Sequence, residues 1–196
     1  MPDEALGRSL LSIARNAIAV ELDQSASLLS DGAAAEHPAL AAPGATFVTL
    51  LMRGALRGCI GSLEARRSLA ADVGANAVAA AFADPRFPRL SAAEFNATSI
   101  EVSLLSNPET IPVQSETALV AELRPGVDGV VLEYEGKRAT FLPQVWDSLG
   151  EPELFLGELK RKAGLAIDFW SPALQVSRYR VTKWREMDSR PVEEAS

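Results

Sequence analysis

The sequence contains one cysteine, Cys59, and one histidine, His37. A single cysteine excludes an internal disulfide, and one residue of each type excludes a zinc site built from several His or Cys ligands. No motif for a metal ion or a bound cofactor is present, so we expect neither. The sequence also lacks an apolar run of about 18 residues, the length that a membrane span requires. We therefore expect a protein that does not cross a membrane.

Two further features are missing. The N-terminus shows no basic region followed by an apolar core, the pattern of a secretory signal, and with the lone thiol this predicts a cytoplasmic location. A surplus of basic residues is also absent, since the formal net charge is −7. Residues 160–185 hold seven basic side chains and one acidic one, which we interpret as solvated faces of a helix and a strand. Because nucleic-acid binding needs an excess of Lys and Arg, we expect no such partner.

The remaining composition is ordinary for a globular protein. The chain has 196 residues, of which 47% are hydrophobic and 23% are charged, and a chain of this length buries a sizeable core. No internal repeat, low-complexity region or long linker interrupts it. We predict a single domain over residues 4–186, followed by a flexible tail over residues 187–196.

The apolar patterns predict helices mixed with strand pairs. Helical spacing and capping residues indicate helices, whereas β-branched and alternating runs indicate strands. The predicted helices cover residues 4–22, 69–83, 115–123 and 153–163. The predicted strands cover residues 46–52, 56–60, 99–105, 130–134, 137–142 and 174–184, with hairpins at 53–55 and 135–136. The alternation slips phase within 174–184, which suggests a β-bulge. This order predicts an α+β fold with a mainly antiparallel sheet and packed helices.

The stretch Leu56–Gly61 is the most distinctive part of the chain, because it holds the thiol between two glycines, Gly58 and Gly61. A missing Cβ lets the backbone take positive φ or lets a ligand or helix come close. Cys59 is therefore either a reactive thiol or a small buried residue on a packed strand. Arg57, two residues earlier, is expected on the same strand face, where its charge would stabilise a thiolate.

Other polar residues are candidates for the same site. Glu101 lies on the polar side of the strand 99–105, as a group for proton transfer or as an exposed strand residue. Asp84 and Arg86 lie in a proline-rich segment, where they either line a cleft or pair with each other. His37 precedes a proline in a polar loop, and we interpret it as a surface residue rather than a general base.

Five segments, taken in order, resemble the AMMECR domain family, whose bacterial and archaeal members are called AmmeMemoRadiSam system protein A. They are Leu56–Gly61, Asp84–Phe87, Glu101–Ser103, Leu123–Gly129 and Phe141–Trp146, within a resemblance that spans about Leu10 to Arg185. The resemblance implies a larger lobe made from both chain ends, a smaller inserted lobe, and the cysteine motif near an interdomain cleft. It also implies association with a Memo-like protein and a radical SAM protein.

Two functional hypotheses remain open. In the first, the protein is a binding module for a small molecule, a peptide or a partner protein, and its site includes Arg57, Gly58, Gly61, Asp84 and Arg86. In the second, it is an enzyme or redox component in which Cys59 is the nucleophile or thiol carrier and Glu101 handles protons. We favour the first slightly, because no histidine stands in a recognisable catalytic context. The substrate, the direct partner and the oligomeric state stay open.

Overall fold

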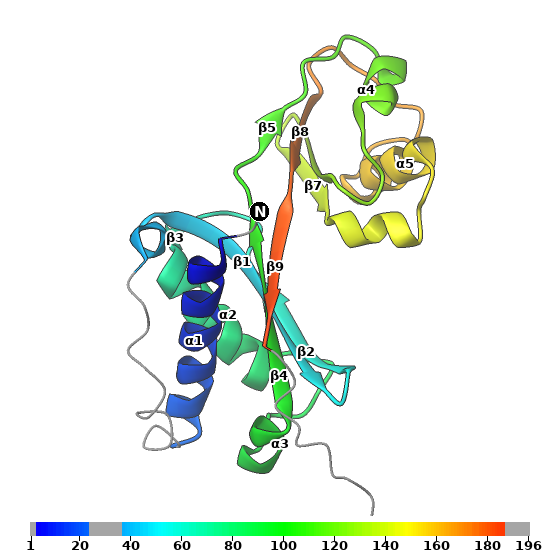
Figure 1. Cartoon of the computed structure of the whole chain (residues 1–196). Coiled ribbons are helices and arrows are strands. Elements are labelled where there is room, and N and C mark those ends of the chain that lie inside the picture. Colours follow the sequence, from blue (N-terminus) through cyan, green and yellow to red (C-terminus); the bar gives the residue numbers. More distant parts are fainter. Residues whose placement is uncertain (1–2, 24–36, 187–196) are drawn as a thin grey trace, which may run out of the picture. The chain divides into compact units, whose positions relative to one another are not determined.

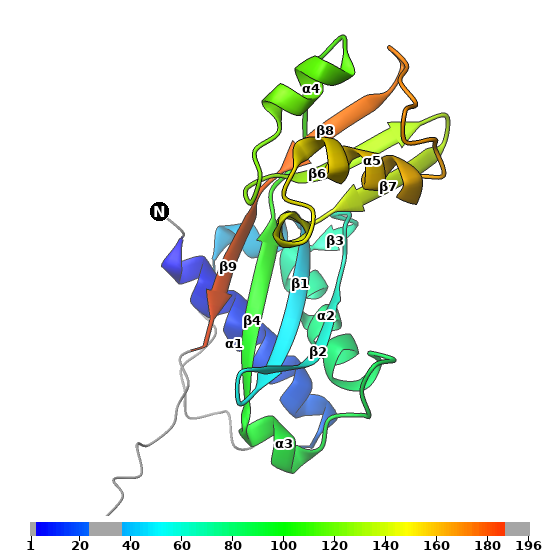
Figure 2. The ribbon, with the colours of Figure 1, turned by 90° about the vertical axis from the view of Figure 1, so that its right-hand side faces the viewer.

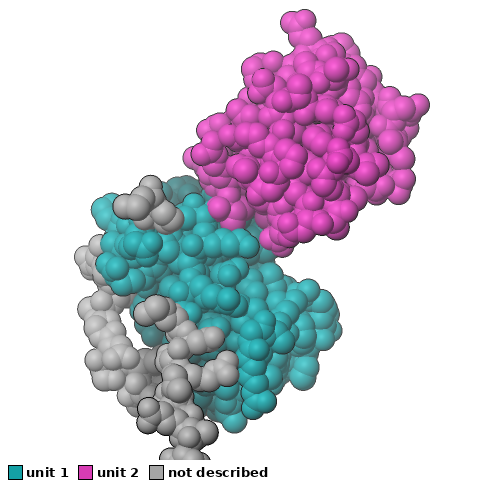
Figure 3. Space-filling model, turned by 45° about the vertical axis from the view of Figure 1, so that its right-hand side comes forward, with its two compact units in different colours: residues 1–105, 182–196 teal, residues 106–181 magenta. Residues whose placement is uncertain are grey.

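The structure is a computed structural model that describes residues 3–23 and 37–186 (Figure 1). The chain divides into two compact units, shown in two colours in Figure 3. Unit 1 comprises Met1–Leu105 and Thr182–Ser196, and unit 2 comprises Ser106–Val181. Each unit has its own sheet and its own hydrophobic core. The expected α+β fold, with a larger lobe built from both chain ends, is confirmed.

The sheet of unit 1 has the strand order β2–β1–β4–β9, and a short β3 pairs with one end of β1. The strands are β1 (Pro43–Met52), β2 (Ala55–Gly61), β3 (Arg67–Ser68), β4 (Thr98–Leu105) and β9 (Val181–Arg185). β1 and β2 form the expected hairpin. Its two turn residues, Arg53 and Gly54, have φ angles of 52° and 80°, as in a type I′ turn, which suits the twist of the flanking strands. β2 is therefore an edge strand whose outer backbone groups face away from the sheet.

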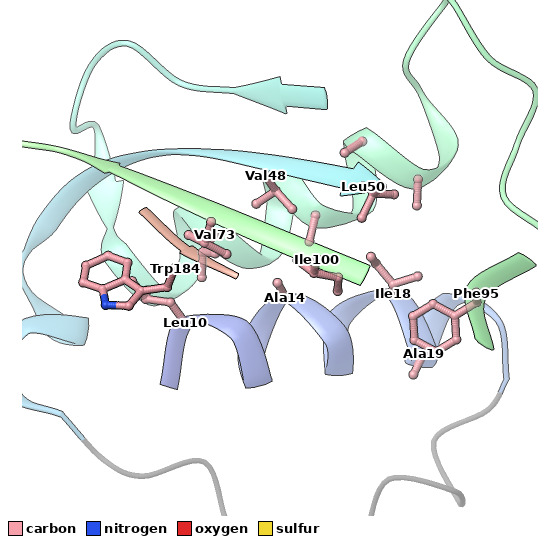
Figure 4. Packing of buried hydrophobic residues seen from close by; sticks show 14 of the residues in the cluster. Leu10, Ala14, Ile18, Ala19, Val48, Leu50, Val73, Phe95, Ile100 and Trp184 are labelled. Carbon is pink, nitrogen blue, oxygen red and sulfur yellow. The ribbon is translucent and has the colours of Figure 1, made fainter. Parts of the chain in front are cut away.

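Two long helices cover one face of this sheet, as Figure 2 shows. α1 (Glu4–Glu21) begins at Asp3, whose carboxylate accepts hydrogen bonds from the first turn, and α2 (Leu69–Phe82) begins at Ser68, whose hydroxyl does the same. Both helices contribute to one core with the inner side of the strands (Figure 4). Its labelled members are Leu10, Ala14, Ile18, Ala19, Val48, Leu50, Val73, Phe95, Ile100 and Trp184. Such apolar contact dominates the stability of a unit of this size.

The opposite face of the sheet carries no helix within the described part of unit 1 (Figure 2). We call it the open face. It presents the side chains that alternate with the buried residues of each strand. These are Phe47, Thr49 and Leu51 on β1, Leu56, Cys59 and Gly61 on β2, Ser99, Glu101 and the buried Ser103 on β4, and Lys183 and Arg185 on β9.

Unit 2 holds a second antiparallel sheet in the order β5–β8–β6–β7, formed by β5 (Glu109–Thr110), β8 (Gln175–Tyr179), β6 (Gly129–Tyr134) and β7 (Lys137–Phe141). β6 and β7 form the second expected hairpin, with positive φ at both turn residues, Glu135 and Gly136. Three helical segments pack their apolar residues on one side of this sheet. They are α4 (Glu116–Glu122), the 3-10 helix η3 (Pro143–Asp147) and α5 (Pro152–Lys162).

Two of the segments that carry the family resemblance have a structural role in unit 2. The side chain of Asp128 is fully buried and accepts hydrogen bonds from the guanidinium and the backbone N–H of Arg124. The indole N–H of Trp146 donates to the backbone carbonyl of Asp128 at 2.7 Å, and its ring stacks on Phe155. These contacts join the start of β6 to η3 and α5.

The prediction of one long strand over residues 174–184 is wrong. The structure has two strands, β8 and β9, separated at Arg180, and they belong to different sheets. The phase of the alternation changes because each half faces a different core: Val176 packs in unit 2, and Trp184 packs in unit 1. The slip that suggested a bulge thus marks the passage from one unit to the other.

Some expectations concern residues that the structure does not describe. The predicted tail 187–196 and most of the predicted loop after α1, residues 24–36, lie outside the described residues. Within residues 3–23 and 37–186, no helix is long and apolar enough to cross a membrane. The same residues contain no cluster of three or more His, Cys, Asp or Glu side chains that could hold a metal ion.

Candidate functional site

Cys59 lies on the open face, in a row of polar side chains that crosses four strands. It is directly opposite Thr49 on β1, and Thr49 is in turn opposite Glu101 on β4. The hydroxyl of Thr49 donates to the Cys59 sulfur at 3.3 Å. On the far side, Lys183 Nζ lies 3.7 Å from a carboxylate oxygen of Glu101. The row therefore presents a thiol, a hydroxyl, a carboxylate and an ammonium group.

The two candidate catalytic residues are too far apart for direct proton transfer. Neighbouring strands are separated by about 4.8 Å, so Cys59 and Glu101, two strands apart, stand roughly 10 Å from each other. Thr49 occupies the space between them. Only a ligand that reached across the row would contact both groups.

Asp84 and Arg86 hold the backbone of Cys59 from the free edge of β2. Asp84 accepts from the Cys59 backbone N–H at 2.8 Å, and Arg86 donates to the Cys59 carbonyl at 3.2 Å. The two side chains are also paired with each other at 2.7 Å. We call this arrangement the Asp84–Arg86 clamp. It satisfies two edge groups that a neighbouring strand would otherwise pair, so it protects this edge from unwanted strand addition.

The charges of the clamp differ in exposure. The Asp84 side chain is 2% exposed, whereas that of Arg86 is 53% exposed. The hydrogen bonds from the Arg86 side chain, helped by the N–H groups of Cys59 and Arg86, hold the pKa of Asp84 well below its ordinary value against the opposing effect of burial. The bond to Asp84 raises the pKa of Arg86, and the adjacent Cys59 side chain adds to this effect. The cation beside the thiol is therefore Arg86.

Arg57 does not share the face of Cys59, contrary to the sequence-based expectation. The β1–β2 ladder contains a bulge between the pairs Leu50–Gly58 and Leu51–Leu56, so Arg57 has no partner residue on β1. A bulge breaks the alternation of side chains and redirects the extra residue. The Arg57 side chain is 6% exposed and donates to Glu94 at 3.0 Å.

Arg57 instead fastens the segment that carries the clamp. Besides its pair with Glu94, its guanidinium donates to the carbonyl of Pro88 at 3.0 Å and lies 5.8 Å from the ring centre of Phe87. Hydrogen bonds from Arg57, and then from Ser91, lower the pKa of Glu94 from 4.5 to about 2. Arg57 thus fixes the chain that follows Asp84 and Arg86 without contacting the thiol.

The two glycines of the motif are packing positions. A Cβ on Gly58 would lie 2.2 Å from the carbonyl oxygen of Ala80 in α2, and one on Gly61 would lie 2.2 Å from the ring of Phe47. Neither glycine has positive φ. Gly58 therefore lets helix α2 come close to the strand, which is one of the roles expected for a glycine here. Gly61 makes room for the ring of Phe47 on the open face.

His37 serves as a cap. Its Nδ1 accepts from the backbone N–H of Ala39 at the start of the 3-10 helix η2 (Pro38–Ala41), and its Nε2 lies 3.0 Å from Asp3. This agrees with its interpretation as a surface residue. Sequence reasoning did not single out Thr49 and Lys183, which stand next to Cys59 and Glu101. The alternation of residues 46–52 was the available signal for Thr49, but its partner depended on the exact register.

The fold and this site define a two-unit α+β protein with a single thiol on an open sheet face and a clamp at the strand edge. The model of the AMMECR1 family matches residues 11–184, and the chain belongs to that family. A protein of Sulfolobus acidocaldarius is 37% identical over 194 residues, covering 93% of this chain and 82% of the relative. A protein of Methanothermobacter thermautotrophicus is 37% identical over 183 residues, covering 92% and 94%.

One solved structure is similar over nearly the whole chain. The uncharacterized protein PH0010 from Pyrococcus horikoshii is 31% identical, with a TM-score of 0.72, and the match covers 95% of this chain and 93% of that one. The resemblance identified from the five sequence segments is therefore confirmed.

Proposed function

We propose that this AMMECR1-family protein is a binding module whose open face, around Cys59, receives a small molecule, a peptide or a segment of a partner protein. The observation that carries the proposal is the row of Cys59, Thr49 and Glu101, which presents partly exposed polar groups on a rigid sheet. Sites on strands hold their side chains more precisely than sites on loops. The clamp further fixes the backbone of Cys59.

A Memo-like protein and a radical SAM protein are the proposed partners, on the strength of family membership. The family match supports this proposal because the chain carries all five segments of the resemblance within residues 11–184. A sheet face that carries apolar side chains such as Phe47, Leu51 and Leu56 beside the polar row suits a protein segment, since an interface combines apolar contact with complementary polar groups.

The alternative function is an enzyme or redox component that uses Cys59. The half-exposed guanidinium of Arg86, which donates to the Cys59 carbonyl, and the hydrogen bond from the Thr49 hydroxyl to the sulfur favour it, since reactive cysteines lie beside such groups. Against it, no histidine or carboxylate among the described residues hydrogen-bonds to the sulfur. A catalytic thiol is ordinarily activated by such a base.

Biolayer interferometry with the purified Memo-like and radical SAM proteins of the same organism tests the proposal. Thr49→Arg places a long cation in the middle of the open face and should abolish binding. Ala75→Arg introduces the same cation at an exposed position of α2, on the other side of the sheet, and should leave binding unchanged. Equal binding by both variants would reject the open face as the site.

Cys59→Ser separates the two functions. As part of a binding surface, the thiol is replaced by a hydroxyl of similar size, and the affinity should change by no more than about threefold, the effect of one weak contact. As a nucleophile or thiol carrier, it cannot be replaced, and the activity of the assembled system should be lost.

A further inference from the structure

The open face carries positive charge at both of its margins, although the whole chain has a net charge of −7. At the β2 edge the Arg86 side chain is 53% exposed while its counterion Asp84 is buried. At the β9 edge the Lys183 side chain is 50% exposed and Arg185 is also exposed. The side chain of Arg185 makes no hydrogen bond or ion pair with any described residue. The carboxylate on the face is that of Glu101, which is only 22% exposed.

These charges have spare hydrogen-bonding capacity. The clamp uses Nε and Nη2 of Arg86, and Nη1 makes no hydrogen bond within the described residues. The two N–H groups of Nη1 can each donate to a carboxylate oxygen, so the exposed end of Arg86 suits an acidic group. Among the described residues, Lys183 makes one contact, at 3.7 Å to Glu101, which is longer than a hydrogen bond.

We propose that the open face binds an acidic, extended peptide segment of a partner protein, with its carboxylates on Arg86 at one margin and on Lys183 and Arg185 at the other. This inference rests on the proposed function and gives the occupant of the same face its chemistry. Thr49 and Ser99 are partly exposed between the margins and offer hydroxyl groups to the peptide backbone.

The same features disfavour a nucleic acid. A nucleic acid is held by many phosphate contacts at once, whereas this face offers three exposed cations and places a carboxylate, Glu101, among them. A peptide can place a neutral or hydrogen-bond-donating side chain opposite Glu101 and its carboxylates opposite Arg86, Lys183 and Arg185. The charge pattern is therefore complementary to a segment with separated acidic residues.

Fluorescence anisotropy with the full chain and a labelled decapeptide of alternating glutamate and serine tests the inference. We expect saturable binding that weakens with rising salt, as for exposed charge pairs. The double variant Lys183→Gln with Arg185→Gln should weaken it roughly three- to tenfold, the effect of two exposed charges. Arg86→Gln should weaken it as well. Arg8→Gln removes an exposed charge from α1, which covers the opposite face, and should have no effect.

Three results would overturn the inference: no saturable binding of the decapeptide, the same loss with Arg8→Gln as with the β9 pair, or equally tight binding of a single-stranded decanucleotide. Far-UV circular dichroism of each variant shows whether it is folded. If Arg86→Gln unfolds, the double variant of Lys183 and Arg185 remains the test, because within residues 3–23 and 37–186 these two side chains have no partner but Glu101. Suppose that the partner proteins bind and that Thr49→Arg prevents this binding, but that the decapeptide does not bind. Then the acidic-peptide inference is rejected and the proposed function is retained. If Thr49→Arg leaves partner binding intact, the proposed function falls instead.

Discussion

Replacing Gly58 with alanine should destabilise the protein by forcing strand β2 and helix α2 apart. The added Cβ would lie 2.2 Å from the carbonyl oxygen of Ala80 and 3.1 Å from its carbonyl carbon. Both atoms belong to the backbone of α2, so no flexible side chain can move aside. Overpacking of a tightly packed region costs about 1–3 kcal/mol, and we expect the upper part of that range, about 2–3 kcal/mol, because the overlap exceeds 1 Å.

Gly74→Ala is the matched control, since it makes the same chemical change in the helix that Gly58 faces. A Cβ there would meet Ile13 at 3.8 Å and Ala17 at 3.9 Å, which are ordinary van der Waals distances. Glycine inside a helix costs roughly 0.5–1 kcal/mol relative to alanine. Gly74→Ala should therefore stabilise unit 1 by about that amount, opposite in sign to Gly58→Ala.

Urea unfolding measures both variants. Far-UV circular dichroism follows the whole chain, and fluorescence of Trp184 reports on unit 1 when Trp146 and Trp170 of unit 2 are replaced by phenylalanine. In thermal unfolding, the Tm of Gly58→Ala should fall by roughly 5–10 °C, as a loss of this size implies for a chain of 150–250 residues. If Gly58→Ala were within about 0.5 kcal/mol of the wild type, the close approach of α2 would not be the reason for glycine at this position.

Three further predictions concern the same region. Arg57→Lys should lower the free energy of unfolding in urea by about 2–3 kcal/mol, because lysine cannot reproduce the forked contact of the buried guanidinium with Glu94 and Pro88. The control is Arg66→Lys, at a side chain that is 81% exposed, which should leave that free energy unchanged. The pKa of Glu94 is about 2 when folded and 4.5 ordinarily, so its contribution is complete above about pH 4.5 and is lost as the pH falls toward 2. Between pH 4.5 and pH 2, Glu94→Gln should therefore lose less stability than the wild type. An identical loss would refute the contact between Arg57 and Glu94. Cys59 is partly exposed, so iodoacetamide should label it in the native protein; labelling only in denaturant would contradict its place on the open face, and a rate that titrates well below about 8.5 would favour the enzyme alternative.

Local signals made most of the fold predictable. The two hairpins follow from turn residues with positive φ between β-branched runs, and the helices follow from caps such as Ser68 and from apolar spacing. The prediction failed where one apparent strand crosses from unit 2 into unit 1 at Arg180. Periodicity reports the face that is buried, and it does not report which sheet the strand has joined.

The candidate site was predictable only in part. The sequence singled out Cys59, Asp84 and Arg86, and the structure brings these three together. The sequence-based expectation that Arg57 is the cation beside the thiol was wrong. Arg57 contacts Glu94, which is 37 residues away in the chain. Partners at such separation depend on how the segment after α2 folds back, which no local pattern records.

What the sequence determined by itself is most of the helices and strands and the presence of one thiol between two glycines. The turn at Arg53 and Gly54 also sets the register next to it, with Met52 opposite Ala55 and Leu51 opposite Leu56. Continued without interruption, that register would pair Cys59 with the fully buried Val48 and turn the thiol into the core.

The tertiary structure decided otherwise. The bulge at Arg57 advances β2 by one residue, so that Gly58 meets α2 and Cys59 is opposite Thr49 on the open face. Because side chains alternate with a period of two, this single extra residue moves the thiol from one face of the sheet to the other. The bulge is compatible with the packing because Glu94 and Pro88 receive the side chain of Arg57 and because Gly58 has no Cβ to collide with Ala80.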